Sequence, residues 1–224
     1  MMKQILKRLF WHIPCNYILM FHHVASEPTI KCSSCVLDSD RFNRLIEDIR
    51  NSCVSLEQLG KSKYRKKFAI TFDDGLEDTY SIAYPILKKY NIPFTIFVVT
   101  DFLNLPGYLT KQQLLEMCEN PLVTVGAHGV SHEILSEMSY AQQKREIEES
   151  KRMLEKLIGK EVKYFAYSHG QYNADTLKLV KVYDNAFSVK GLPYNFITRN
   201  CKWQLPRINI TDSTIEEKVA SFDL

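Results

Sequence analysis

Phe68-Ala69-Ile70-Thr71-Phe72-Asp73-Asp74-Gly75 joins an apolar run directly to two adjacent carboxylates. The apolar part is typical of a buried strand, so both aspartates are predicted to lie where that strand ends. Burying two carboxylates is costly unless a cation pairs with them. A turn followed by a helix cap is the simpler alternative, because Asp and Gly are common there.

Short apolar runs alternate with segments of helical period along the rest of the chain. This rhythm predicts an α/β protein with a parallel sheet or barrel, and 224 residues fit one domain spanning 1–224. We expect strands over 17–21, 68–72, 93–100, 123–127, 164–167, 186–189 and 205–210. We expect helices over 39–50, 76–90, from 110, and over 139–158, 174–183 and 213–220, with Pro85 bending or dividing the second. Thr110 with Gln113 and Ser139 with Gln142 predict capping boxes, and Gly159 is expected to end the helix over 139–158.

Composition excludes few classes of protein. Hydrophobic residues make up 45% and charged residues 25%, and the net charge of +3 is too small to indicate a nucleic-acid partner. No run reaches the ~18 apolar residues of a membrane-spanning helix. The amphipathic start, 1–13, is expected to cap the barrel, with peripheral contact to a membrane surface as the alternative. It lacks the apolar core of a secretion signal, from which we expect a cytoplasmic location.

Six cysteines are scattered along the chain, and we expect them to be reduced thiols. Cys32 and Cys35 have the spacing of a redox or zinc pair, but no second pair follows at a zinc-ribbon distance. We therefore interpret this segment as a loop with incidental thiols.

Two histidines, His128 and His132, offer partners for the aspartates. Gly126 and Gly129 flank the first histidine, which indicates a strand end running into a loop or a helix start. One carboxylate and two neutral imidazoles form a usual ligand set for a catalytic divalent metal, most simply Zn²⁺, with Co²⁺, Ni²⁺ or Fe²⁺ as alternatives. The remaining aspartate is then available as a base. A hydrogen-bonded pair of loop histidines is the simpler interpretation of this motif taken alone.

Thr71-Phe72-Asp73-Asp74-Gly75 followed by His-x-x-x-His resembles the polysaccharide deacetylase family (carbohydrate esterase family 4, the NodB homology domain). The resemblance extends over about 17–210 and implies an irregular (β/α)7 barrel. It also implies a metal-dependent hydrolase that removes acetyl groups from N-acetylated sugars. By this resemblance Asp74, His128 and His132 would hold the metal, and Asp73 would be the general base.

A later motif of the family corresponds to 164–172, where a subgroup has Phe-Ala-Tyr-Pro-Tyr-Gly-x-Tyr. Here Ala166 stands where other members have arginine, and Ser168 replaces the proline. The resemblance implies that Tyr167 and Tyr172 contact sugar, although a core role for Tyr167 is equally compatible. His169 stands at an aromatic position, where it would bind substrate or fill a wall.

The last strand, 205–209, has no histidine to serve as the family's general acid. The chain is similar to the poly-N-acetylglucosamine deacetylase subgroup, in which an N-terminal strand supplies that acid, and this implies His22. The alternative is a structural histidine at the barrel end. His23 should face the other way in an extended strand. Arg207 is expected to pair with a carboxylate of the site, such as Asp73, and to keep it ionised.

Together these patterns predict a metal-dependent N-deacetylase that acts on an acetylated glycan or glycan precursor. The cytoplasmic expectation favours a lipid-linked or nucleotide-linked precursor. Two other interpretations stay open, which are a catalytically silent barrel that binds glycan and a metal-dependent amidase or esterase with a non-sugar substrate.

Overall fold

The computed structural model describes residues 15–26, 35–61, 66–189 and 201–221. The amphipathic segment 1–13 and Cys32 lie outside these ranges, so the predictions made for the N-terminus and for the cysteine pair stay predictions. No helix within the ranges combines the length and the apolar character needed to cross a membrane.

Eight parallel strands of the described chain form one sheet in the order β10-β1-β4-β5-β6-β7-β8-β9. They are β1 (Tyr17–Phe21), β4 (Phe68–Phe72), β5 (Phe94–Val98), β6 (Val123–Ala127), β7 (Tyr164–Ala166), β8 (Asn185–Ser188), β9 (Leu205–Pro206) and β10 (Ile208–Asn209). A second small sheet pairs β2 (His23–Val24) with β3 (Val36–Leu37).

One short segment closes the barrel. β9 pairs with β8, whereas β10 pairs with β1, and only Arg207 separates the two. The predicted last strand is thus a single stretch whose halves join opposite edges of the sheet. Counting β9 and β10 as one position leaves seven, which confirms the predicted irregular (β/α)7 barrel.

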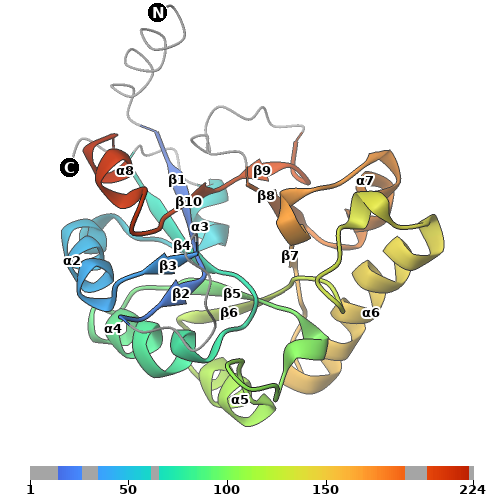
Figure 1. The fold of residues 1–224 in the computed structure, drawn as a ribbon, viewed down its shortest axis with the longest axis horizontal. Coiled ribbons are helices and arrows are strands. Elements are labelled where there is room, and N and C mark those ends of the chain that lie inside the picture. Colours follow the sequence, from blue (N-terminus) through green and yellow to red (C-terminus); the bar gives the residue numbers. More distant parts are fainter. Residues whose placement is uncertain (1–14, 27–34, 62–65, 190–200, 222–224) are drawn as a thin grey trace, which may run out of the picture.

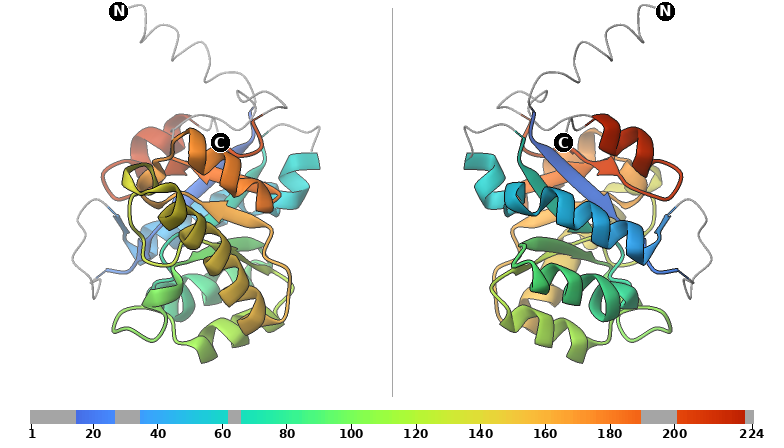
Figure 2. Two further views of the ribbon diagram at one scale, coloured as in Figure 1. Left: turned by 90° about the vertical axis from the view of Figure 1, so that its right-hand side faces the viewer. Right: turned by 90° about the vertical axis from the view of Figure 1, so that its left-hand side faces the viewer.

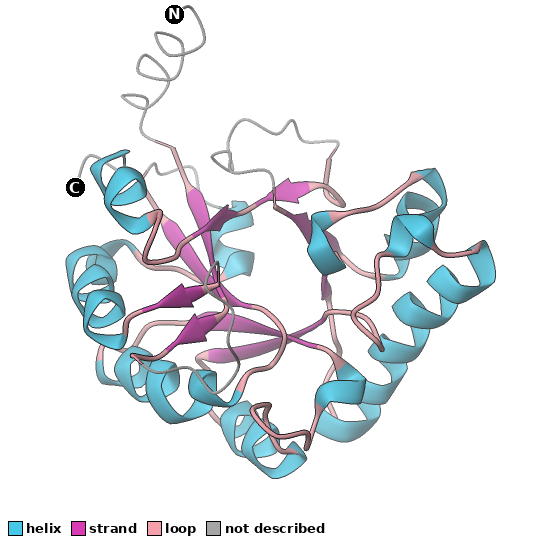
Figure 3. Ribbon diagram, viewed as in Figure 1, coloured by secondary structure: helices cyan, strands magenta, loops and turns pink. Residues whose placement is uncertain are grey.

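Helices surround the strands on the outside, as Figures 1 and 3 show, except for one short helix that lies at an end of the barrel. They are α2 (Ser39–Ile49), α3 (Leu56–Lys61), α4 (Tyr84–Lys89), α5 (Lys111–Glu119), α6 (Tyr140–Ile158), α7 (Ala174–Leu179) and α8 (Ile215–Ser221). The two side views show α2 on one flank and α6 with α7 on the other (Figure 2). Neither α3 nor the small sheet was predicted from the sequence, because both are too short to show a clear period.

Capping chemistry sets the boundaries of the best-predicted helices. Thr110 and Ser139 each accept a hydrogen bond from the backbone amide of the Gln three residues later. The side-chain oxygen of that Gln accepts in turn from the Thr110 or Ser139 backbone amide, so both predicted capping boxes are confirmed. Gly159 ends α6 at φ 66°, a left-handed conformation that glycine adopts without steric cost. The divided helix is also confirmed, because a π-helical turn, Thr79–Ala83, precedes α4 and its Pro85.

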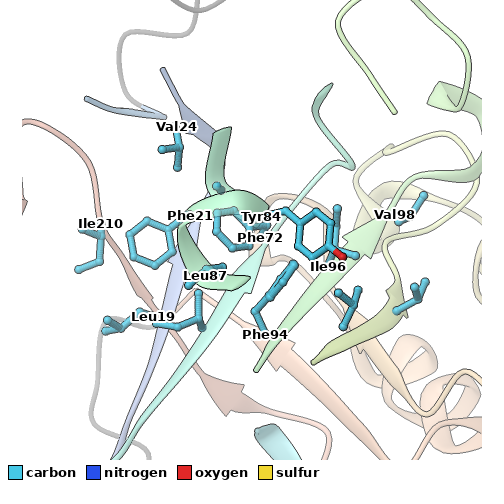
Figure 4. Packing of buried hydrophobic residues seen from close by; sticks show 14 of the residues in the cluster. Leu19, Phe21, Val24, Phe72, Tyr84, Leu87, Phe94, Ile96, Val98 and Ile210 are labelled. Atoms are coloured by element: carbon cyan, nitrogen blue, oxygen red, sulfur yellow. The ribbon is translucent and has the colours of Figure 1, made fainter. Parts of the chain in front are cut away.

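Two apolar clusters lie on opposite faces of the strands. The outer one packs the strands against the helices, as Figure 4 shows for part of the cluster. In this cluster Phe42 of α2 contacts Phe21 and Phe72 at ring-centroid distances of 5.2 and 5.9 Å. The inner one fills the barrel with alternate strand residues such as Ile18 and Phe97. Helix α3 adds two leucines to the inner cluster near the start of β4 and so plugs that end of the barrel. The opposite end, where the strands finish, is left for polar side chains.

Candidate metal centre and its surroundings

A left-handed turn places the paired aspartates at the end of β4. The Asp73 amide donates to the Phe21 carbonyl of β1 at 2.9 Å, which extends the parallel ladder by one residue. Asp74 and Gly75 then adopt φ values of 71° and 74°. Aspartate tolerates this region better than most residues, and strained backbone of this kind is concentrated at functional sites. The chain therefore turns sharply while both carboxylates stay at the strand end.

The two histidines of the second motif lie on a loop, which decides between the loop and the helix that the sequence left open. The His128 amide continues the ladder by donating to the Val98 carbonyl at 3.0 Å, and His132 adopts φ 67°. Gly129, at φ 83°, allows the intervening turn. This turn, and not helical spacing, directs both imidazole rings toward one point, as the predicted ligand set requires.

Asp74, His128 and His132 converge, as the sequence predicted. One donor atom from each lies within 4.8 Å of the other two. The Asp74 Oδ1 atom is 3.4 Å from His128 Nε2 and 3.2 Å from His132 Nε2. The His128 side chain is 2% exposed, whereas those of His132 and Asp74 are 23% and 20% exposed. The cluster is therefore closed on the protein side and accessible from outside.

The chemistry of these donor atoms fits a bound cation. His128 Nδ1 lies 2.8 Å from the Ala166 carbonyl, which only accepts, so Nδ1 carries the proton and the Nε2 of a neutral ring presents a lone pair. That lone pair faces Asp74 Oδ1, which is buried and accepts no hydrogen bond from the described residues. Two acceptors that face each other are stabilised by a positive charge between them.

Electrostatics in the cluster point the same way. Burial alone would lower the pKa of His128, but Asp73 and Asp74 raise it above its usual value. Burial would raise the pKa of Asp74, but the approach of His128 and His132 holds it well below its usual value. The carboxylates thus attract positive charge to this point, and a divalent ion would supply it without protonating the imidazole.

Asp73 has a separate partner. Arg207 donates from both terminal nitrogens to the two carboxylate oxygens at 2.6 and 2.7 Å, so the predicted contact is present in bidentate form. Both side chains are buried, at 0% and 3% exposure. Burial would raise the pKa of Asp73, but Arg207, with His128 and His22, lowers it below its usual value. Asp73 is therefore held as an anion 3.7 Å from the His128 Nε2 atom.

The position of Arg207 depends on the split strand. It sits between β9 and β10, its amide donates to the Ser188 carbonyl at 3.1 Å, and its guanidinium carbon lies 5.1 Å from the Phe97 ring centroid. The barrel closure thus delivers a cation into the interior, above an aromatic ring from the inner cluster. No sequence pattern specifies this side-chain direction.

His22 lies at the bend between β1 and β2, where the charges of Asp73, Asp74, Arg207 and His128 act on its pKa. Burial is the largest influence on its pKa, which is lowered from the usual value. His23 points elsewhere, as predicted: its ring pairs with Asp78, with Nδ1 2.5 Å from Oδ2. His22 is thus placed at the site, and its role as an acid stays a prediction.

The residues predicted to contact substrate are divided by the structure. Tyr167 is fully buried, and its hydroxyl donates to the Trp203 carbonyl at 2.6 Å, so it belongs to the core and is not a sugar-contacting surface. Its ring packs against that of Tyr172 at a centroid distance of 4.6 Å. Tyr172 itself is partly buried. His169 is exposed at φ 55°, with its ring 4.7 Å from that of His132. His169 therefore borders the cluster, as substrate binding requires, and its role stays a prediction.

Two aromatic residues near the cluster were missed in the sequence. Phe102 lies 4.7 Å from Tyr108 and 6.0 Å from His132, measured between ring centroids. Burial raises the pKa of Tyr108, and Asp74 adds to the rise. Together with His169 these rings line one side of the cluster. Both come from the loop after β5, which carries no motif, so no sequence signal marks them.

Glu146 was missed as well, although its place in α6 was readable. Helical period puts it on the buried stripe with Ile147, Ser150 and Leu154, which is unusual for a glutamate. Its carboxylate accepts from the amides of Val130 and Ser131 at 2.7 and 2.9 Å, and from the Ser131 hydroxyl at 2.9 Å. Glu146 therefore anchors the loop that connects the two histidines.

Glu146→Ala is expected to lower the free energy of unfolding by about 2–4 kcal/mol, because three donors lose a charged acceptor. Glu146→Gln should cost less than half as much, since the amide can accept from the two backbone groups and donate to the serine oxygen. Urea denaturation of the purified variants measures both values. Glu148→Ala, an exposed position on the same helix, is the matched control and should change stability by less than about 0.5 kcal/mol. Equal stability of the two alanine variants would contradict the anchoring role.

Comparison with known proteins places the chain in a sequence family. Residues 60–187 match the family described as polysaccharide deacetylase. The poly-beta-1,6-N-acetyl-D-glucosamine N-deacetylase of Staphylococcus aureus is 32% identical over 185 residues, which covers 73% of this chain and 61% of that protein. YxkH of Bacillus subtilis is 34% identical over 118 residues, or 53% of this chain and 42% of that protein. The chain thus spans less than two thirds of the length of these relatives.

Solved structures agree in fold over nearly the whole chain. The Streptococcus pyogenes deacetylase PplD, in complex with acetate, is 25% identical with a TM-score of 0.82, covering 93% of this chain and 97% of that one. IcaB from Ammonifex degensii shares the fold at 19% identity, with a TM-score of 0.75 and coverage of 94% and 98%.

Proposed function

Because the chain belongs to the polysaccharide deacetylase family, we propose that it is a metal-dependent hydrolase that removes acetyl groups from N-acetylated sugars. The observation that carries the proposal is the convergence of Asp74, His128 and His132 beside an ionised Asp73. A barrel that only binds glycan has no need of a buried base held next to a complete ligand set.

Each residue of the site has a separate role in the proposed reaction. Asp74, His128 and His132 would hold the divalent ion, most simply Zn²⁺, which when bound would lower the pKa of water and polarise the acetyl carbonyl. Asp73 would accept the proton of the attacking water, and Arg207 keeps that carboxylate ionised and oriented. His22 would donate a proton to the nitrogen as the carbon–nitrogen bond breaks. The products are acetate and the free amine of the sugar.

The substrate proposed is a glycan of N-acetylglucosamine. The Staphylococcus aureus relative is named for the β-1,6-linked polymer, and it matches 73% of this chain. Exposed or partly buried rings of Phe102, Tyr108 and His169 beside the cluster offer surfaces on which a sugar ring can pack.

The test is acetate release from defined oligomers. The protein, stripped with a chelator and reloaded with Zn²⁺, Co²⁺, Ni²⁺ or Fe²⁺, is incubated with β-1,6-linked and β-1,4-linked N-acetylglucosamine oligomers. We expect acetate release that is lost on chelation, restored by metal, and faster for the β-1,6 linkage. Metal binding without acetate release from any sugar, but with hydrolysis of simple amides or esters, would favour the non-sugar alternative. Absence of metal binding would favour a silent barrel.

A further inference from the structure

His23 and Asp78 form a buried hydrogen-bonded pair that the reaction above does not use. Their side chains are 3% and 10% exposed, and His23 Nδ1 lies 2.5 Å from Asp78 Oδ2. The residues are 55 positions apart in the sequence. Removing two such polar groups from water is costly unless they bond to each other. His23 directly follows His22, the proposed acid, and the pair is therefore placed to influence that residue.

The pair joins the two segments that carry the proposed acid and base. His23 follows His22 at the bend after β1, and Asp78 lies four residues after Asp74, at the start of the π-helical turn. The neighbouring Phe21 carbonyl accepts from the Asp73 amide at 2.9 Å. The residues on both sides of His22 thus contact the segment 73–78. The Phe21 backbone before it bonds to Asp73, and the His23 side chain after it bonds to Asp78.

His22 itself lacks side-chain support within the described residues. Its Nδ1 atom is buried without a hydrogen-bond partner there, in contrast to His128, whose Nδ1 is held by the Ala166 carbonyl. The direction of the His22 ring is therefore fixed by its backbone and by packing. The His23 amide adds a third tether, because it donates to the Cys35 carbonyl at 3.1 Å.

We propose that His23 and Asp78 are a positioning pair that holds His22 in place to protonate the leaving nitrogen. This inference rests on the proposed function. In the step concerned, the water oxygen bonds to the acetyl carbon, one water proton passes to Asp73, and the carbonyl π electrons move onto the carbonyl oxygen. The carbonyl double bond then re-forms as the carbon–nitrogen bond breaks with its electron pair going to nitrogen. That nitrogen takes the proton from His22, which leaves the acetyl group as acetic acid.

The leaving group separates positioning of an acid from general damage to the site. An amide nitrogen needs a proton to depart, whereas 4-nitrophenolate departs without one. We therefore compare an acetylated sugar and 4-nitroacetanilide, both amides, with 4-nitrophenyl acetate, an ester. His23→Leu and Asp78→Ala should lower kcat on the amides at least ~10-fold, and kcat on the ester less than ~3-fold, with metal content unchanged. The same pattern, with a larger loss, is expected for His22→Ala.

Conservative variants keep the test informative if the drastic ones unfold. His23→Asn places an amide donor near the position of Nδ1 and should restore most of the amide activity, as should Asp78→Asn, which keeps an acceptor. Adding His23→Leu to His22→Ala should cause no further loss on the amides, because the pair acts through His22. Asp212→Ala is the control, since Asp212 accepts from the Asp38 amide and Arg41 beside α2 without contacting the His22 bend; it should leave both rates unchanged.

Equal losses on the amides and the ester, or unchanged amide rates in His23→Leu, would overturn the positioning role. The aryl substrates keep this result separate from the proposed function. If the wild type acts on 4-nitroacetanilide but on no acetylated sugar, the sugar assignment fails while the comparison of leaving groups still decides the role of the pair.

Discussion

Replacing Asp74 with alanine is expected to abolish metal binding and acetate release together. Asp74 supplies the only carboxylate of the three-residue cluster in the described chain, and the two imidazoles alone cannot compensate the charge of a divalent ion. His128→Ala should have the same effect, because it removes the most buried of the three donors. Metal content after reconstitution and dialysis, measured by mass spectrometry, and acetate release from the same samples check both expectations.

Backbone conformation calls for a second variant at this position. Asp74 has φ 71°, and alanine in the left-handed region costs roughly 1–2 kcal/mol. Asn tolerates that region, so Asp74→Asn keeps the turn while it removes the charge. Asp101→Ala, which removes an exposed carboxylate after the adjacent strand β5, is the matched control and should retain metal and activity. A stoichiometric metal and normal turnover in both Asp74 variants would refute the assigned ligand set.

Asp73→Asn is expected to keep the metal and to lose at least ~100-fold in kcat, the usual effect of removing a general base. The asparagine is close in shape, but it cannot accept the proton of the attacking water. The separation of metal content from turnover distinguishes this variant from those at Asp74. Full activity in the Asp73→Asn protein would show that another group takes the proton.

Stability must be measured alongside the rate. Arg207 is fully buried, and Asp73→Asn leaves its charge without a carboxylate, which is expected to cost about 3–5 kcal/mol. Circular dichroism and a thermal melt fix a temperature at which the variant is folded, and kcat is compared there. A loss of rate that disappears once folded protein is counted would assign Asp73 to stability and not to catalysis.

Local patterns predicted the parts of the molecule that depend on near neighbours. β1, β6 and α2 fall within a residue of their expected bounds, because continuous apolar runs and helical period are read from short windows. Both capping boxes and the glycine stop of α6 follow from hydrogen bonds within four residues. The position of the aspartates at a strand end follows in the same way.

Contacts between distant segments limited the prediction of the site. For Tyr167 the resemblance left sugar contact and a core role equally open, and only the fold shows that its ring is enclosed by the core. A charged residue on the buried stripe of a helix is a weak indication of a role for Glu146. Its hydrogen-bond partners, 15 and 16 residues away, could not be predicted from the sequence. Phe102 and Tyr108 lie on a loop without periodicity, so only folding brings them beside His132.

Sequence alone determined the parallel α/β rhythm, the strand that presents two carboxylates, and the residue types able to bind a divalent ion. The tertiary structure decided that the histidine motif is a loop, that Arg207 clasps Asp73 across the barrel closure, and that His23 pairs with Asp78. The physical reason is the sequence separation over which each kind of interaction acts. Backbone preference and hydrophobic period act over a few residues, whereas pairing between buried charges depends on where the closed sheet places side chains up to 134 positions apart.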